Sequence, residues 1–187
     1  MPAYHSSLNE EPDVRQVGNM SVLPIKTKIR GPAPLGMGVL YLTEPEAADI
    51  IDETLDLFRA NSLFRNFEIK GPADRLLIVL ILFVSDCLAK LGSARTVPAQ
   101  LEANKTLNTL AVDNFPIPGD ANFALNAHYA TPGNRADAEY LRQYLTQVRQ
   151  ELAARLIERL YADGTGKPSK WWMAFQKRRF MNRSLGA

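Results

Sequence analysis

The sequence predicts an all-α fold of about five helices, with one helix buried at the centre and a long irregular arm before the others. Three observations support this. The stretch 76–84 is apolar without interruption, which indicates a helix buried on every side. Leucine and valine recur every three or four residues over 141–160, the period of an amphipathic helix. Prolines cluster in 1–45 and 96–135 and separate the helical intervals.

Residues 1–42 are expected to form an irregular arm that wraps over the helices. Pro24 and the glycines and prolines of 31–38 argue against a long regular element there. The arm also carries apolar side chains that need burial, so we expect it to pack against the body. These residues are Val22, Leu23, Ile25, Val39, Leu40 and Leu42.

The first helix is expected to begin near Thr43. Thr43 and Glu46 fit a capping box, and Pro45 fits the first turn. Apolar residues then recur on one face as far as Phe58. We expect this helix to fray over 61–66.

Two more helices are expected before the middle of the chain. One covers about 72–91 and ends at Gly92. Its length favours a helix over a buried strand, and its apolar centre makes it the predicted central helix. A weaker helix covers 98–112. Its inward leucines are expected to be Leu101, Leu107 and Leu110.

The second half begins with an irregular loop over 113–133, pinned to the body by its aromatic residues. The longest helix follows over 134–163, with Glu151 and Arg155 as an i, i+4 ion pair on its outer face. A last helix is expected to open at Pro168. Its aromatic residues are Trp171, Trp172, Phe175 and Phe180.

The length of 187 residues fits a single helical domain over 1–187. We divide it into the arm (1–42), a helical body (43–163) and a basic, aromatic C-terminal helix and tail (164–187). Residues 1–163 hold 16 basic and 20 acidic residues, a net charge of −4, whereas the last part holds six basic residues and no acid, a net charge of +6. This asymmetry points to a partner for the tail. The overall charge of +2 argues against a dedicated nucleic-acid coat.

The sequence predicts no catalytic, cofactor-binding or metal site. Cys87 is the single cysteine and lies in an apolar stripe, where its thiol is unreactive. His5 and His128 are too few for a zinc cluster. Gly164–Lys167 lacks the preceding strand, the first glycine and the final Ser or Thr of a phosphate-binding loop. No signal peptide is visible, and 76–84 is too short to cross a membrane, so a cytoplasmic location is expected.

The tail is the strongest local signal. Its cations alternate with aromatic residues, a pattern that suits an acidic protein surface, nucleic acid or an anionic membrane. The plainer interpretation is a docked helix whose rings fill the core and whose charges are solvated. Trp171 and Trp172 point about 100° apart on a helix, so we expect at most one of them to be exposed.

Short motifs spread along the chain resemble one family, the 21-kDa third subunit of the actin-related protein 2/3 complex. They keep their order and spacing from the first residue almost to the last. The motifs are Met1-Pro2-Ala3-Tyr4-His5-Ser6-Ser7, Gly18-Asn19-Met20, Leu23-Pro24-Ile25, Gly31-Pro32-Ala33-Pro34, Asn114-Phe115-Pro116-Ile117-Pro118-Gly119, Leu125-Asn126-Ala127, Lys167-Pro168-Ser169-Lys170-Trp171-Trp172 and Phe180-Met181-Asn182.

The resemblance implies a non-catalytic subunit of a seven-subunit assembly that nucleates branched actin filaments. It implies a small helical domain that packs chiefly on the actin-related protein 3 subunit and helps the complex engage the mother filament, in the cytoplasmic actin cytoskeleton. It implies no nucleic acid and no membrane insertion. The alternative is a free-standing module that binds nucleic acid or anionic membrane through the tail.

Two stretches, 35–44 and 93–103, depart from the family pattern, so no contact is carried over to them. The predicted partner-binding residues follow from residue type within the matched basic tail and the matched loop 115–119. They are Phe115, Ile117, Lys170, Trp171, Lys177, Arg178 and Arg179.

Overall fold

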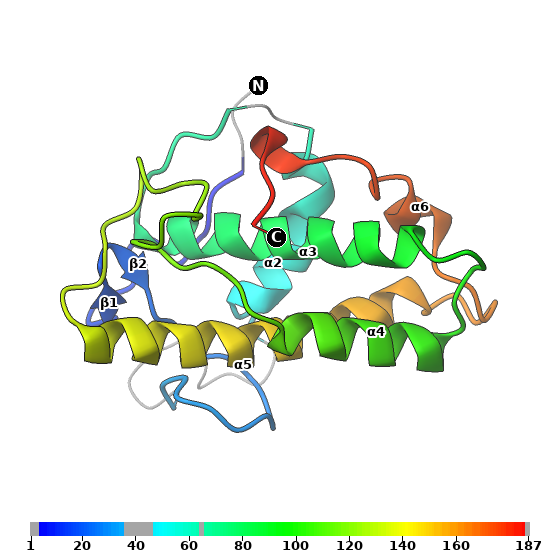
Figure 1. Ribbon diagram of the computed structural model, residues 1–187, viewed down its shortest axis with the longest axis horizontal. Helices are drawn as coiled ribbons and strands as arrows, with labels where there is room; N and C mark the ends of the chain where they lie inside the picture. Colours follow the sequence, from blue (N-terminus) through cyan, green and yellow to red (C-terminus); the bar gives the residue numbers. More distant parts are fainter. Residues whose placement is uncertain (1–3, 36–46, 64–65, 186–187) are drawn as a thin grey trace.

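The computed structural model describes residues 4–35, 47–63 and 66–185. Within these ranges the fold is helical, with one two-stranded hairpin, as Figure 1 shows. The elements, in chain order, are β1 (Gln16–Val17), β2 (Met20–Ser21), α2 (Ile50–Asn61), α3 (Pro72–Gly92), α4 (Gln100–Val112), α5 (Arg135–Leu160), α6 (Lys170–Met173) and the 3-10 turn η1 (Phe180–Asn182). The predicted all-α class is confirmed.

The helix α3 lies at the centre of the fold. It contacts α2, α4, α5, α6, η1 and β2, and no side chain from Leu76 to Val84 is more than 6% exposed. Pro72 stands in its first turn, where a missing N–H costs no hydrogen bond. Figure 1 shows α3 crossing the middle of the molecule, with α4 and α5 running along one side of it. The predicted central helix is confirmed.

The helix α5 is the longest element and carries the predicted apolar series on its inner face. Asn134 caps it, because its side chain accepts the N–H of Asp137 at 2.8 Å. All six residues of the series are at most 2% exposed. They are Leu141, Leu145, Val148, Leu152, Leu156 and Leu160.

The helix α4 packs along α5 through a face that includes the predicted Leu107 but not the predicted Leu101. Ala103, Leu107 and Ala111 are fully buried and recur every four residues, so they form one face. Leu101 is 66% exposed, so its predicted inward orientation is wrong, and Leu110 is half-buried. The two small alanines explain the difference, because they let the backbones of α4 and α5 approach closely.

The arm contains a short hairpin that the sequence did not predict. Strands β1 and β2 pair antiparallel, with Val17 opposite Met20. Gly18 turns the chain between them at a φ of +60°, and a Cβ there would lie 2.4 Å from the carbonyl oxygen of Ala130. Glycine is therefore required both by the turn and by the close approach of the loop before α5.

Polar side chains of α5 hold the arm by its backbone. The Tyr144 hydroxyl donates to the carbonyl oxygen of Leu23 at 2.7 Å and accepts the N–H of Leu23 at 3.0 Å. Gln147 donates to the carbonyl oxygen of Ile29 at 2.9 Å and accepts the N–H of Ala33 at 2.8 Å. The described part of the arm, residues 4–35, thus wraps over the helices as predicted, and side chains of α5 satisfy backbone groups of Leu23, Ile29 and Ala33. The predicted burial of Val39, Leu40 and Leu42 lies outside the described residues.

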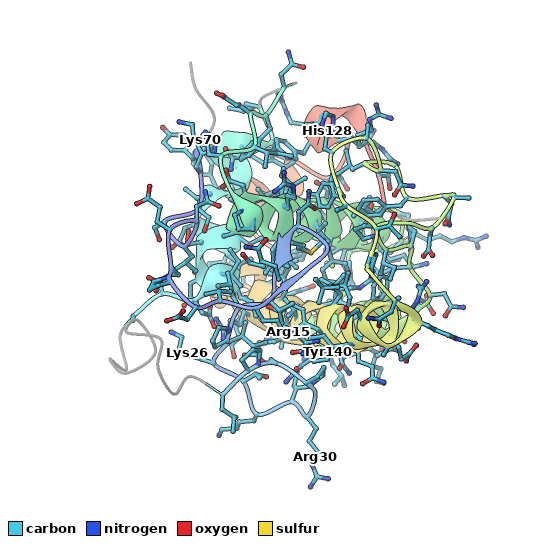
Figure 2. The ribbon with its side chains drawn as sticks, turned by 90° about the vertical axis from the view of Figure 1, so that its left-hand side faces the viewer. Arg15, Lys26, Arg30, Lys70, His128 and Tyr140 are labelled. Atoms are coloured by element: carbon cyan, nitrogen blue, oxygen red, sulfur yellow. The ribbon has the colours of Figure 1, made fainter. Side chains whose placement is uncertain are left out.

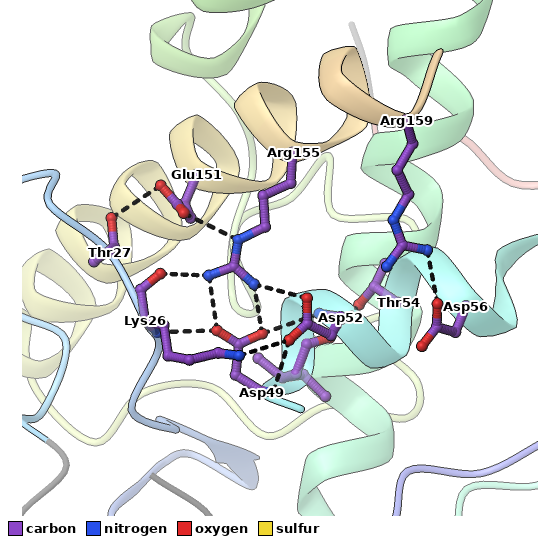
Figure 3. Close-up of polar contacts among 10 residues, drawn as sticks. Lys26, Thr27, Asp49, Asp52, Thr54, Asp56, Glu151, Arg155 and Arg159 are labelled. Carbon is purple, nitrogen blue, oxygen red and sulfur yellow. Dashed lines mark hydrogen bonds and ion pairs between the residues drawn. The ribbon is translucent and has the colours of Figure 1, made fainter. Parts of the chain in front are cut away.

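The start of α2 is joined to α5 and the arm by a cluster of charged residues (Figure 3). Asp49 is fully buried and caps α2 by accepting the N–H of Asp52 at 3.0 Å. Arg155 donates to both carboxylate oxygens of Asp49, at 2.8 and 2.9 Å, and to Glu151 at 3.0 Å. The N–H of Lys26 donates to Asp49 at 2.9 Å, and Arg155 donates to the Lys26 carbonyl oxygen. This one cluster therefore holds the arm, the start of α2 and α5 together.

This cluster corrects two predictions. The helix α2 begins at Ile50 because Asp49 caps it, and the predicted capping positions 43–46 lie outside the described residues. The ion pair of Glu151 with Arg155 forms as predicted, but each side chain is only 16% exposed. It lies beneath the arm and not on an open outer face, since the Thr27 hydroxyl covers Glu151 with a 3.1 Å hydrogen bond.

The beginning of the arm is clamped to the start of α3. Asp74 is fully buried and accepts hydrogen bonds from the N–H of Ser6 at 2.8 Å and the N–H of Lys70 at 3.0 Å. Its carboxylate also lies 2.7 Å from Nδ1 of His5, whose ring packs edge-on against Phe67. The pairing of His5 with a carboxylate is thereby part of a structural clamp.

Candidate partner-binding surface

Aromatic side chains hold the C-terminal segment to the body. Trp172 stacks on Phe58 at 5.8 Å between ring centroids, and Phe175 meets the same ring edge-on at 6.1 Å. Phe180 meets Phe67 at 5.7 Å. The predicted final helix is present but covers only Lys170–Met173, so it includes Trp171 and Trp172, while Phe175 and Phe180 lie beyond its end. Trp172 and Phe175 share Phe58 as their partner, whereas Phe180 reaches Phe67, and the irregular segment after α6 allows this second contact.

The neighbours of these anchors face outward. Trp171 is 75% exposed, whereas Trp172 is 6% exposed, which confirms that the two rings divide between surface and core. Lys170, Lys177 and Arg178 are exposed, and so is Arg179. The surface of this segment therefore presents one large ring among cations.

The cations of this segment have no carboxylate partners in the described part of the chain. All nine ion pairs found there lie within residues 5–159. Arg178 lies 5.7 Å from the ring of Phe175, a cation–π distance. The positive charge of the tail is consequently available to an external anion, whereas most buried charge in the body is compensated internally.

The loop 115–119 is held rigidly by Asp120. This carboxylate accepts the N–H of Ile117 at 2.9 Å and two hydrogen bonds from Arg142, at 2.8 and 2.9 Å. Burial would raise the pKa of Asp120, but these hydrogen bonds outweigh it and lower the pKa below its ordinary value. Arg142 also donates to the carbonyl oxygen of Phe115 at 3.3 Å.

The two predicted partner-binding residues of this loop have different environments. Phe115 is half-buried, so part of its ring is accessible. Ile117 is 1% exposed and packs in the core. The apolar Ile117 side chain therefore anchors the loop from within, and its contact with a partner stays a prediction.

The structure brings Phe115 and Arg179 to one groove. This groove has a volume of about 420 Å³ and lies between α3, the end of α4, α5 and the C-terminal segment. Lys90 of α3 and Arg149 of α5 also line it, together with Asp86. We call it the Arg149 groove. Two residues predicted from separate motifs thus share one concave surface.

Arg149 is the unusual residue of this groove. Arg149 is only 9% exposed. Its guanidinium carbon lies 4.5 Å from the ring centroid of Phe83 and 4.2 Å from that of Phe115. Nη2 donates to the carbonyl oxygen of Leu110 at 2.7 Å, near the end of α4. Burial lowers the pKa of Arg149 to about 10 despite the nearby charge of Asp86.

One of the remaining predicted residues, Lys170, lines a second groove, which lies between the end of α3, the segment 94–98 and α6. Its volume is about 470 Å³. Lys170 lines it together with Val97 and Met173, and Arg95 and Lys167 add positive charge. Its described lining contains no acidic residue. Sequence reasoning assigned no contact to 93–103, yet part of that stretch forms this wall.

A further cluster of cations on the arm was not predicted. Lys26, Lys28 and Arg30 are exposed and alternate with the half-buried Thr27 and Ile29. Figure 2 shows Arg30 pointing away from the body. The signal that could have revealed them is the alternation of basic and other residues over 26–30, because alternate residues of an extended chain share one side.

Groups that could carry out catalysis are placed for packing or solvent contact. Cys87 is fully buried, and burial raises the pKa of its thiol above the ordinary value. His128 is exposed in the loop before α5. Among the described residues no cluster of three or more metal-ligating side chains occurs. No helix in the same residues is long and apolar enough to cross a membrane. The arrangement offers grooves and charges for binding.

Comparison with known proteins gives a match over nearly the whole chain. The family model described as P21-Arc, the ARP2/3 complex ARPC3 (21 kDa) subunit, matches residues 1–185. The actin-related protein 2/3 complex subunit 3 of Schizosaccharomyces pombe is 53% identical over 185 residues, covering 99% of this chain and 100% of the relative.

Two other relatives carry the same name. The subunit 3 of Saccharomyces cerevisiae is 50% identical over 189 residues, which covers 99% of this chain and 100% of the relative. That of Dictyostelium discoideum is 45% identical over 183 residues, or 97% of this chain and 99% of the relative. These matches therefore include both ends of the chain and the segments that form the grooves.

Proposed function

The chain belongs to the ARPC3 (21 kDa) subunit family of the ARP2/3 complex, and we propose that it is a non-catalytic structural subunit of that complex in the cytoplasmic actin cytoskeleton. In this role it supports the nucleation of branched actin filaments by binding geometry alone. The relatives named as subunit 3 support the assignment. The buried thiol of Cys87 also suits packing better than catalysis.

The finer proposal is that the body packs on the actin-related protein 3 subunit and that the tail helps engage the mother filament. The observation that carries it is the contrast in charge. In the body the largely buried Arg155 pairs with Asp49, whereas Lys177 and Arg178 of the tail are exposed and have no carboxylate partner among the described residues. Since the actin surface is acidic, these cations suit the filament.

The packing on the neighbouring subunit is proposed to use apolar contacts. Trp171 is a large exposed ring, and tryptophan is a common hot-spot residue in protein interfaces. Its chain neighbour Lys170 lines the second groove, whose wall includes Val97 and Met173. An apolar and partly basic surface of this kind suits a stable contact with a subunit.

The test reverses the tail charge within the assembled complex. A Lys177→Glu, Arg178→Glu double variant should weaken attachment to actin filaments by about tenfold or more and reduce branching, because four units of charge change at an electrostatic contact. The matched control is Arg135→Glu, which changes an exposed cation on α5. Filament co-sedimentation and branch counting at fixed ionic strength give the readout.

The outcomes separate the proposal from its alternative. If branching activity and complex integrity both stay unchanged, the tail assignment is wrong. A chain recovered alone that binds nucleic acid or anionic vesicles, with affinity that falls steeply as salt is added, would instead support a free-standing module.

A further inference from the structure

Arg149 brings a positive charge into the protein without an ion pair. Its side chain is nine-tenths buried, and no carboxylate of the described residues forms an ion pair with it. Its Nε is buried and has no hydrogen-bond partner among the described residues. The single hydrogen bond found for its guanidinium goes to a neutral carbonyl oxygen, that of Leu110. A charge in this position is unfavourable unless an anion reaches it.

The same helix shows how this chain compensates a buried guanidinium. Arg155 lies less than two turns further along α5 and is 16% exposed at its side chain. It pairs with Asp49, Asp52 and Glu151 at distances between 2.8 and 3.1 Å. Arg149 and Arg155 are similarly buried, yet among the described residues only Arg155 has carboxylate partners.

The surroundings of Arg149 leave room for a ligand at its edge. The rings of Phe83 and Phe115 contact the guanidinium at 4.5 and 4.2 Å. Guanidinium donors lie in the plane of the group, so stacked rings orient it without using its N–H groups. The Arg149 groove, about 420 Å³ in volume, opens beside it. The edge of the guanidinium is thus left for a ligand that enters the groove.

The charge of the lining favours an anion. Lys90, Arg149 and Arg179 line the groove with positive charge, and Asp86 and Asp113 line it with negative charge, so the balance is +1. Asp86 accepts a hydrogen bond from the Ser184 hydroxyl at 2.9 Å. Asp113 is exposed at the end of α4. The groove is of a size that admits one side chain with its backbone.

We infer that the Arg149 groove receives an Asp or Glu side chain from a neighbouring subunit of the complex, which pairs with the guanidinium of Arg149. This inference rests on the proposed function. A permanent subunit contact is favoured over the filament because a carboxylate that reaches Arg149 must enter the groove and lose its hydration, and permanent complexes have the larger and more apolar interfaces that can offset this cost. In the assembled complex this carboxylate forms the ion pair that Arg149 lacks among the described residues of this chain.

The test uses three arginine-to-methionine variants on the same helix. In the free full-length chain, Arg149→Met should leave the melting temperature within about 2 °C or raise it, because an unpaired buried charge is removed. Arg155→Met should lower it clearly, because Asp49 is left buried and unpaired. Arg135→Met should change it little, because Arg135 is exposed.

In the assembled complex, Arg149→Met and Arg135→Met should differ clearly, although both leave the free chain about as stable as the wild type. Exchange of labelled subunit against an excess of free subunit should become at least about thirtyfold faster with Arg149→Met, because the neighbour's carboxylate is left buried without its partner. Arg135→Met should exchange at the wild-type rate.

Two results would overturn the inference. One is a fall in the melting temperature of the free Arg149→Met chain as large as that of Arg155→Met, which would mean that its anion is already supplied by this chain. The other is equal exchange rates for Arg149→Met and Arg135→Met. If the wild-type chain itself fails to enter the complex, the proposed function fails instead, and the two failures are thereby distinguished.

Discussion

Replacement of Arg155 by methionine tests the idea that one charged cluster joins the arm, α2 and α5. Arg155 donates to both oxygens of Asp49, which is fully buried, and to the carbonyl oxygen of Lys26. Methionine fills much of the same volume without donors. After the substitution, Asp49 retains only the backbone N–H groups of Asp52 and Lys26, and its charge is otherwise uncompensated at neutral pH.

The magnitude follows from the burial of the pair. Removal of one partner from a buried ion pair costs roughly 3–5 kcal/mol, and the two remaining backbone donors place the cost near the lower bound. A domain of this size loses about 2–4 °C per kcal/mol. Arg155→Met should therefore lower the melting temperature by about 6–12 °C, measured by circular dichroism on the full-length chain.

The matched control lies one turn further along the same helix. Arg159 pairs with Asp56 at 2.7 Å, but the two side chains are 36% and 61% exposed (Figure 3). Exposed pairs contribute little, so Arg159→Met should change the free energy of unfolding by no more than about 1 kcal/mol. Equal losses in Arg155→Met and Arg159→Met would refute the reasoning, because burial would then not decide the cost.

Three further predictions concern single sites. Phe180→Ala should lower the free energy of unfolding by about 3–5 kcal/mol in denaturant titrations, because Phe180 is fully buried. The control Trp171→Ala should change it by no more than about 0.5 kcal/mol, because Trp171 is exposed. Similar losses in the two variants would contradict these positions. Cys87 should react with an aqueous thiol reagent only on unfolding, since it is fully buried and its thiol pKa is raised, and rapid labelling of the native chain would oppose this. Burial raises the pKa of Glu53 despite its hydrogen bonds from serines, so its contribution to stability is lost as the pH rises through that pKa. Burial alone would raise the pKa of Asp52, but the Lys26 hydrogen bond and the charge of Arg155 lower it overall. The contribution of Asp52 to stability is therefore lost as the pH falls through this lowered pKa. Plots of stability against pH should accordingly flatten on the higher-pH side for Glu53→Gln and on the lower-pH side for Asp52→Asn.

The sequence predicted correctly the elements whose structure depends on their own residue pattern and not on distant contacts. The apolar stretch 76–84 can only be satisfied inside the fold, and the leucine series of α5 fits only a helix against a core. Asn134 and Pro72 mark helix starts by local chemistry. For these elements, tertiary contacts agree with the local preference.

The errors arose where a distant residue decides a local structure. The start of α2 is set by Asp49, whose carboxylate is held by Arg155 more than 100 positions later. The final helix is broken because Trp172 and Phe180 reach separate aromatic partners. Sequence spacing contains neither constraint.

The candidate site was predictable only in its exposed part. The tail cations and Trp171 could be identified by residue type, because charge without nearby acids is visible in the sequence. Arg149 could not, since an arginine among leucines resembles any helix surface residue. Its burial depends on Phe83 and Phe115 converging from α3 and a loop.

The native mass and composition of the assembly that contains the chain test the central claim most directly. A tagged full-length chain would be purified from gently lysed cells, and the intact assembly weighed by native mass spectrometry. The account predicts one copy of this chain with two actin-related proteins and several small subunits at fixed stoichiometry. Recovery as a 20.8 kDa monomer, or with nucleic acid alone, would contradict it.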